Sequence, residues 1–209
     1  MVNITEFLPW VLPKTPGCST PLALQAIVDA ALTFCQESIA VRTWLSPIST
    51  VASTAEYSLA GTASERVLRV LDVHVDGTLV YPMPAVFDAA LTPDVSGNPT
   101  RYYARQAGED VQLVLYPTPD KVYSVDVQVS NGPRRTATEV ADDLLHLWLE
   151  PVVAGAVSRV LMIPGQPFTD PASAAFYGAQ AVSGMRKARV SSDLGRVRAT
   201  TSVSMRPFA

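Results

Sequence analysis

Serines and threonines are abundant in this 209-residue chain, but few histidines and cysteines accompany them to activate a nucleophile or to hold a metal ion. The chain has two cysteines, Cys18 and Cys35, and two histidines, His74 and His146. These four are scattered without the spacing that zinc ligands need, so we expect no metal site. Cys35 lies on the apolar side of an expected helix, where a thiol packs as a small hydrophobic side chain. A reducing cytosol would keep both cysteines as thiols.

The residues for acid–base catalysis also lack a suitable arrangement. Asp142 and Asp143 are adjacent on an expected helix and diverge by about 100°, which does not suit a pair of cooperating carboxylates. His146 lies among leucines and His74 alternates with aspartates on an expected strand, and neither pattern favours a general base. No phosphate-binding glycine loop, His-Glu-x-x-His, Cys-x-x-Cys or Gly-x-Ser-x-Gly motif occurs. We therefore predict that the protein is not an enzyme and binds no cofactor.

The composition favours a subunit of an oligomer. Hydrophobic residues make up 48% of the chain and charged residues only 17%, against roughly 25% charged residues in typical soluble domains. A surface covered by neighbouring copies needs fewer charges than one that faces water. No apolar run approaches the roughly 18 residues that span a bilayer. The first 17 residues lack the basic region of a signal peptide, so we expect a soluble protein made in the cytoplasm.

The net charge of −3 is unevenly distributed along the chain. From residue 186 onward six basic residues stand against one acid, a balance of +5, while the rest of the chain carries −8. A basic tail on an acidic body is typical of an interaction segment. Few aromatic residues separate its arginines, so the stacking signature of a single-strand nucleic-acid binder is missing. Its alternating Val-x-Arg-x-Thr-Thr-Ser-Val-Ser pattern suits strand addition to the sheet edge of a partner.

The elements that would position these residues begin with a long helix. Ser19 or Thr20 can cap it, and Pro21 suits its first turn. Apolar residues then recur at helical spacing as far as Val41, which predicts a buried stripe on a helix of about 24 residues. Trp44, at the expected end, is interpreted as a packing anchor.

After residue 46 the pattern changes to β-branched residues in alternation. The Asp76-Gly77 pair predicts a hairpin, and further runs predict about six strands over residues 50–131. Four tyrosines of this region, Tyr102, Tyr103, Tyr116 and Tyr123, are more typical of a sheet core than of a ligand-binding surface.

Helical pattern returns at residue 138. Pro151 should kink or divide the first helix there. Gly165 suits a left-handed helix end, and Asp170 followed by Pro171 predicts the start of an Ala- and Gly-rich helix. The predicted fold is therefore α+β. A small helical bundle (1–46 and 132–188) is interrupted by an antiparallel β insertion (47–131) and followed by an extended C-terminal arm (189–209).

Three motifs in this order carry a family resemblance. They are a Pro-x-Cys segment leading into the long helix, from Pro16 to Trp44; LYPTP, from Leu115 to Pro119; and GAVSRVLMIPGQPFTDPASAAFY, from Gly155 to Tyr177. Over most of its length the chain resembles the head-to-tail connector, or adaptor, proteins of tailed double-stranded DNA bacteriophages, which include the tail tubular A type. Each motif is only moderately specific, and their order and spacing carry the resemblance.

The resemblance implies a structural ring, commonly of twelve copies, in the virion neck between capsid and tail. Such a ring lies beneath the portal protein and above a tail or nozzle protein, and double-stranded DNA passes through it without sequence recognition. It implies no catalytic centre, cofactor, metal or membrane contact. The C-terminal arm would bind the portal through Arg189, Arg196, Arg198, Arg206 and Phe208.

Two alternatives to a neck connector remain open at this point, besides an uncharacterised enzyme. The β insertion could be a module that binds a surface glycan or receptor, which its tyrosines support. The chain could also be a different neck protein, a head-closure or tail-terminator subunit. Those proteins are usually shorter and mostly β, so the long expected helices count against them.

Overall fold

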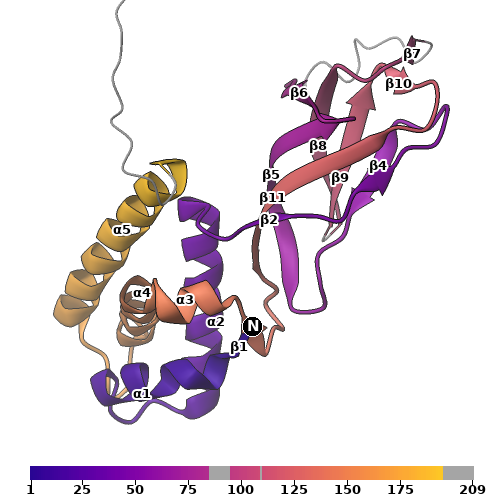
Figure 1. The fold of residues 1–209 in the computed structure, drawn as a ribbon. Helices are drawn as coiled ribbons and strands as arrows, with labels where there is room; N and C mark the ends of the chain where they lie inside the picture. The colour runs from indigo at the N-terminus through magenta and orange to yellow at the C-terminus, as the bar shows by residue number, and fades with distance from the viewer. Residues whose placement is uncertain (85–94, 109, 195–209) are drawn as a thin grey trace, which may run out of the picture.

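A helical part and a strand part make up residues 1–84, 95–108 and 110–194, which the computed structural model describes (Figure 1). The helical part contains α1 (Leu8–Val11), α2 (Thr20–Ser38), α3 (Asp142–His146), α4 (Leu149–Leu161) and α5 (Pro171–Leu194), with 3-10 turns η1 (Ile4–Phe7) and η2 (Leu12–Lys14). The chain passes from α2 into the strands and returns to α3, so the strand part projects from one end of the helical part.

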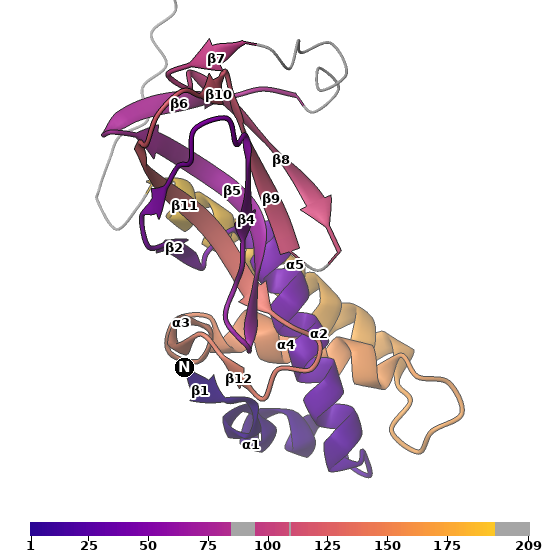
Figure 2. The same ribbon diagram turned by 90° about the vertical axis from the view of Figure 1, so that its right-hand side faces the viewer.

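The strands form one curled sheet (Figure 2). Its order is β2-β11-β5-β6-β8-β9-β4, with β3 also paired to β11. The bounds are β2 (Arg42–Trp44), β3 (Ile48–Ser49), β4 (Glu56–Leu59), β5 (Glu65–Val75), β6 (Thr78–Pro82), β8 (Arg101–Ala107), β9 (Asp110–Tyr116) and β11 (Ser124–Pro133). Two small pairs lie outside this sheet, β1 (Val2–Asn3) with β12 (Glu139–Val140), and β7 (Ser96–Gly97) with β10 (Thr118–Pro119).

The predicted fold class, a small helical bundle with an antiparallel β insertion, is wrong. Strands hold 31% of the described residues and helices 39%, and seven strands curl into a half-barrel. This sheet has a hydrophobic core of its own, which includes Leu59, Val73, Leu113 and Val127. It is also mixed, because β6 pairs with β8 in parallel. Alternation of residue types places strands but does not fix which strands pair, so the pattern did not predict the sheet as a second structural unit.

The extended arm does not begin at residue 189. Helix α5 continues to Leu194 because its last turns are anchored on α2 and on the strand that follows. The Ser192 hydroxyl donates to the carbonyl of Ile39 at 2.7 Å, and Asp193 forms an ion pair with Arg42 at 3.1 Å. The predicted boundaries of the β region at residues 47 and 131 stay predictions.

Helix α2 carries the predicted buried stripe but is shorter than expected. Its buried residues include Ile27, Ala31, Phe34 and Cys35, which pack into the core of the helical part. The helix ends at Ser38 because Ile39 adopts a left-handed conformation, with φ of 53°. Trp44 consequently lies on β2, half-exposed, and is not the end of the helix.

Several local predictions are confirmed. Asp76 and Gly77 both have positive φ, 47° and 75°, in the turn between β5 and β6. The helix around Pro151 is divided into α3 and α4, with the proline in the first turn of α4. The Asp170 carboxylate accepts the backbone N–H groups of Ala172 and Ser173 at 3.1 Å each. Hydrogen bonding to Ser173 accordingly lowers the pKa of that carboxyl.

A glycine sets the distance between the two parts. Gly132 of β11 faces α2, and a Cβ at this position would lie 2.6 Å from Leu68 Cδ1 and 3.2 Å from Cys35 Cβ. The absence of a side chain lets the strand approach the C-terminal half of α2 closely. Strand β11 therefore ties the sheet directly to the helical core.

We expect Ala188→Leu to destabilise the helical part by about 1–3 kcal/mol, since a fully buried alanine has no room for three more carbons. Ala179→Leu makes the same change at an exposed position of α5 and should have little effect. Chemical denaturation followed by circular dichroism measures both. Equal stability of the two variants would contradict the close contact of α5 with the helical core.

Candidate functional site

Helix α5 buries very little of its own surface. Of its 24 residues only Ala174, Ala181 and Ala188 are buried, and they follow one another at intervals of seven. This spacing places them in one narrow stripe along the helix. Large apolar side chains elsewhere on α5 are exposed, Phe176 by 66%, Val190 by 57% and Val182 by 46%. Most of the helix is thus available for contacts outside the described chain.

Small residues explain how α5 stays attached through such a narrow stripe. A Cβ on Gly155 of α4 would lie 3.3 Å from Ala30 and 3.7 Å from Ala181, so α2, α4 and α5 meet closely there. The Ser158 hydroxyl donates to the carbonyl of Ala174 at 2.8 Å. Because these residues are small, the helix backbones come close together. Dispersion contacts between the backbones and the small side chains then hold α5 in place, where other helices bury larger side chains.

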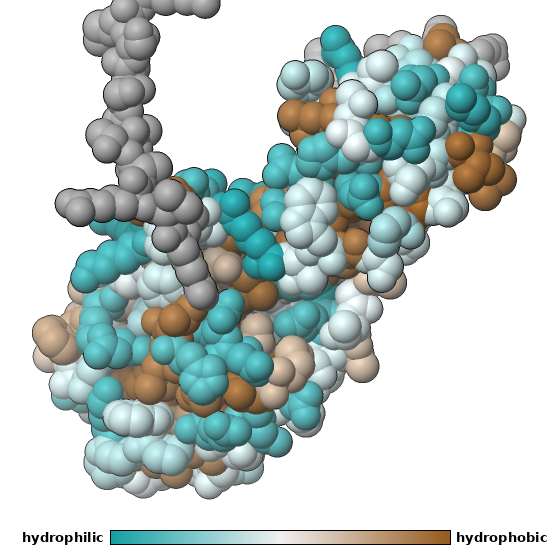
Figure 3. Space-filling view, in the orientation of Figure 1, coloured by the Kyte–Doolittle hydropathy of each residue, from teal (hydrophilic) through white to brown (hydrophobic). Residues whose placement is uncertain are grey.

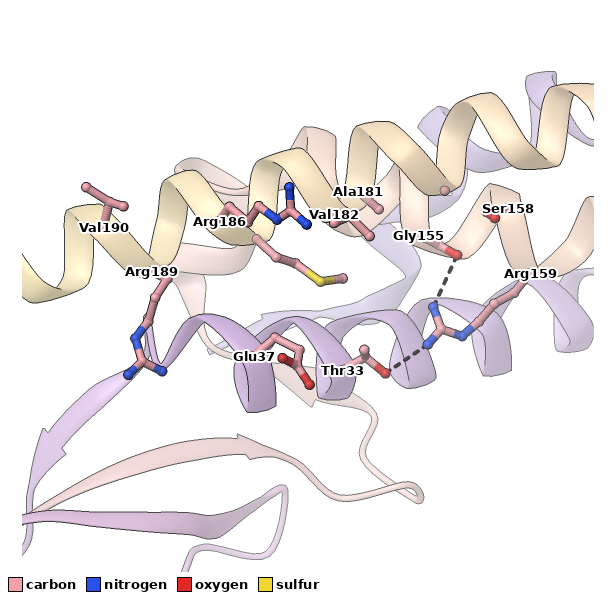
Figure 4. A pocket seen from close by; sticks show the side chains of 12 residues that line it. Thr33, Glu37, Gly155, Ser158, Arg159, Ala181, Val182, Arg186, Arg189 and Val190 are labelled. Atoms are coloured by element: carbon pink, nitrogen blue, oxygen red, sulfur yellow. Dashed lines mark hydrogen bonds between the residues drawn. The ribbon is translucent and has the colours of Figure 1, made fainter.

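A groove lies between α2 and α5, with α4 as its floor (Figure 4). Its volume is about 670 Å³. We call it the basic groove, and it is lined by Thr33, Glu37, Gly155, Ser158, Arg159, Gly178, Ala181, Val182, Met185, Arg186, Arg189 and Val190. Apolar side chains of α5 form one wall, and three arginines stand against a single carboxylate.

The arginines of the basic groove differ in how firmly they are held. Arg159 donates to Thr33 Oγ1 at 2.8 Å and to the carbonyl of Gly155 at 3.3 Å (Figure 4), without a carboxylate. Arg189 pairs with Asp193 at 3.2 Å, one turn further along α5. Within the described residues Arg186 has no ion-pair partner. The lining of the groove therefore has a net positive charge, three guanidinium groups against the Glu37 carboxylate, and Arg186 in it has no ion-pair partner among the described residues.

A surface of the opposite charge lies where α3 meets α4. We call it the acidic corner, and it consists of Asp142, Asp143, His146, Leu147 and Glu150, all exposed. Leu147 is 51% exposed. Asp142 pairs with the N-terminal amine, whereas Asp143 and Glu150 have no ion-pair partner among the residues described. This corner combines an apolar side chain with free carboxylates.

The basic groove and the acidic corner lie on opposite flanks of α5. Val182, Arg186 and Arg189 line the groove, while Gly184 and Lys187 face the segment 145–151 of the corner. At 100° per residue these two sets point to opposite sides of the helix. Figure 2 shows α3 at one edge of the helical part, and Figure 3 shows hydrophobic and hydrophilic residues mixed on the face that carries α3.

Among the residues predicted to bind a partner, the structure describes Arg189 alone, and it lies in α5 rather than in an extended arm. The other predicted residues, Arg196, Arg198, Arg206 and Phe208, lie outside the described residues. The structure brings Arg189 together with Arg186 and Arg159, which the sequence analysis did not single out. The i, i+3 spacing of Arg186 and Arg189 is the signal that places both on one helix face.

The residues considered for chemistry are placed apart from one another. Cys35 is buried and His146 exposed, and the His74 ring lies 5.6 Å from the Trp44 ring on the sheet. Within the described ranges no three His, Cys, Asp or Glu side chains come close enough to hold a metal ion. Tyr102, Tyr103 and Tyr123 are buried and Tyr116 half-buried. These tyrosines therefore offer no exposed rings for stacking on a sugar, which weakens the case for a glycan-binding module.

The helical part thus has an exposed helix with a net positive groove on one flank and an acidic corner on the other. The sequence matches the SU10 adaptor protein family over residues 4–206, nearly its full length, and the chain belongs to that family. It is accordingly a phage adaptor with a structural role, a component of the virion that contacts other phage proteins. No curated protein matches the sequence. Across the described ranges, every helix is too short or too polar to span a membrane.

The buried thiol gives a direct test of the packing of α2. Burial raises the pKa of Cys35 to about 12, with a smaller contribution from Glu65. At pH 8 only roughly one molecule in 10⁴ then carries the reactive thiolate. We expect alkylation of the native protein, followed by mass spectrometry of peptides, to modify Cys18 well before Cys35. Both should react in denaturant, and rapid modification of Cys35 in the native chain would contradict its burial.

Proposed function

We propose that the chain is a structural subunit of a ring in the phage neck, which joins the portal to the tail and continues the DNA channel. Membership of the adaptor family supports this proposal. The structural observation that carries it is α5, which exposes Phe176, Val182 and Val190 while burying only alanines. Large apolar side chains gathered on one helix of a folded chain mark a surface that a partner covers.

A ring requires two different faces on each copy, which meet head to tail and close by rotation. The basic groove and the acidic corner provide such faces on opposite flanks of the helical part. The low charged content of the chain, 17%, fits a subunit of which much is covered by its neighbours. Related connectors commonly form rings of twelve copies, and we propose the same number here.

The strand part is the component that reaches beyond the ring of helices. It projects from the helical part and is tied to it by β11 against α2 (Figure 1). Among the described strands, the edge strand β4 pairs with β9 alone, so its other side could accept a strand of another chain. The sheet can thereby contact the proteins above or below the ring while the helices hold the ring together. This role requires no catalysis and no cofactor.

The C-terminal arm is proposed to bind the portal. Its basic residues are Arg196, Arg198 and Arg206, and the segment after Leu194 contains no acid. These arginines would form charge-assisted hydrogen bonds with carboxylates of the portal. Arg189 lies in α5 and would support the start of the arm without belonging to it. Phe208 would add an apolar contact near the end.

Truncation after Leu194 tests the role of the arm. The cut leaves α5 and its contacts through Ser192 and Asp193 intact, so the helical part should stay folded. We expect co-purification with the portal protein to fall by more than about tenfold, because several charged contacts are lost together. Circular dichroism should be unchanged.

A second variant distinguishes the effect of the arm's positive charge from the effect of shortening the chain. Replacing Arg196, Arg198 and Arg206 by glutamine in the full-length chain should weaken portal binding in the same direction. Undiminished portal binding by both variants would refute the role of the arm, and a full-length chain that never co-purifies with its portal would refute the neck function itself.

A further inference from the structure

The proposed ring leaves open which surfaces of neighbouring copies meet. Two surfaces of the helical part have a net charge of opposite sign, the basic groove, which also holds Glu37, and the acidic corner, which Lys187 adjoins. They lie on opposite flanks of α5. We propose that the basic groove of one copy receives the acidic corner of the next copy, an inference that rests on the ring function proposed above.

The apolar surfaces fit this contact. Leu147, 51% exposed, is the apolar residue at the tip of the acidic corner. Met185, Val182 and Val190 provide an apolar wall along the basic groove. The groove volume of about 670 Å³ admits several side chains rather than one. Insertion of the corner would remove apolar surface of both copies from water, which favours association.

The charges also match. Arg186 in the basic groove and Asp143 and Glu150 on the acidic corner have no ion-pair partner among the described residues. Arg159 is held at the groove floor by Thr33 and Gly155, so it is already oriented for a carboxylate. Guanidinium groups bind carboxylates through two parallel hydrogen bonds, which fixes geometry as well as charge.

The arrangement favours a second copy over other occupants. The C-terminal arm of the same chain carries three arginines and no acid, so like charge opposes its binding in the basic groove. A two-fold dimer would need the same patch on both partners, whereas groove and corner lie on opposite flanks. Contact between them therefore repeats from copy to copy in one direction, which is the kind of contact that a ring requires and that closes when the rotation between copies completes a full turn.

Cysteine cross-linking tests the contact in assembled particles. Leu147→Cys and Met185→Cys are combined in the full-length chain with Cys18→Ser, and the protein is co-expressed with its portal. Mild oxidation should give a ladder of covalent oligomers on a non-reducing gel. Each single cysteine variant is the control and should give no ladder. Rings without the ladder, or a ladder that stops at the dimer, would overturn the contact.

Charge exchange gives an independent readout. Arg186→Glu and Asp143→Arg should each reduce ring formation by about tenfold or more, measured by native mass spectrometry, and the double variant should restore it. Arg101→Glu makes the same charge change at an exposed position of the sheet and should leave ring formation unaltered. Full assembly by both single variants would overturn the contact.

The outcomes separate this contact from the proposed function. An unmodified chain that forms no ring beside its portal overturns both. Rings that form without the cross-link overturn only the groove and corner contact. If the cross-link between residues 147 and 185 forms only after truncation at Leu194, the arm of the same chain occupies the groove in the full-length protein. This result also overturns the contact between copies.

Discussion

The structure depends on the close approach of α5 to α2 and α4 through a stripe of alanines. Ala174, Ala181 and Ala188 let the helix axes come near, with Gly155 on the facing helix. Because the fully buried contact follows this stripe, Phe176, Val182 and Val190 stay outside the core, while Tyr177 and Met185 pack partly against it. The same constraint creates the basic groove, since the space beside a narrow contact between helices is left unfilled. The alanine stripe thus accounts both for the attachment of α5 and for the apolar surface that α5 exposes.

The basic residues near the C-terminus are grouped differently in the structure than along the sequence. In the sequence, the arginines from residue 186 onward form one basic tail. In the structure, Arg186 and Arg189 belong to a rigid helix and line a groove with Arg159, whose position in the chain is remote. The basic character is therefore divided between a fixed surface and the segment beyond Leu194. A surface formed by packed helices suits contact between identical subunits.

Local signals predicted local features well. The Asp76-Gly77 turn, the Asp170 cap, the division at Pro151 and the burial of Cys35 each depend on a few neighbouring residues. Features that depend on distant residues were not predictable. Helix α5 extends past residue 189 because Ser192 contacts Ile39, and the parallel pairing of Tyr81 with Arg101 depends on the curl of the whole sheet. The sequence indicated only that Asp142 and Asp143 diverge on a helix. The groove was not predictable, because it is formed by three helices that no sequence periodicity brings together.

The junction at Gly132 has a mechanical consequence. Gly132 has no side chain to separate β11 from α2 there, and the side chains of Leu68 and Cys35 fill the remaining space. A tilt of the sheet is consequently transmitted to α2 instead of being absorbed at a hinge. Because α2 also forms one wall of the groove, a displacement of the sheet against α2 would reach the groove as well.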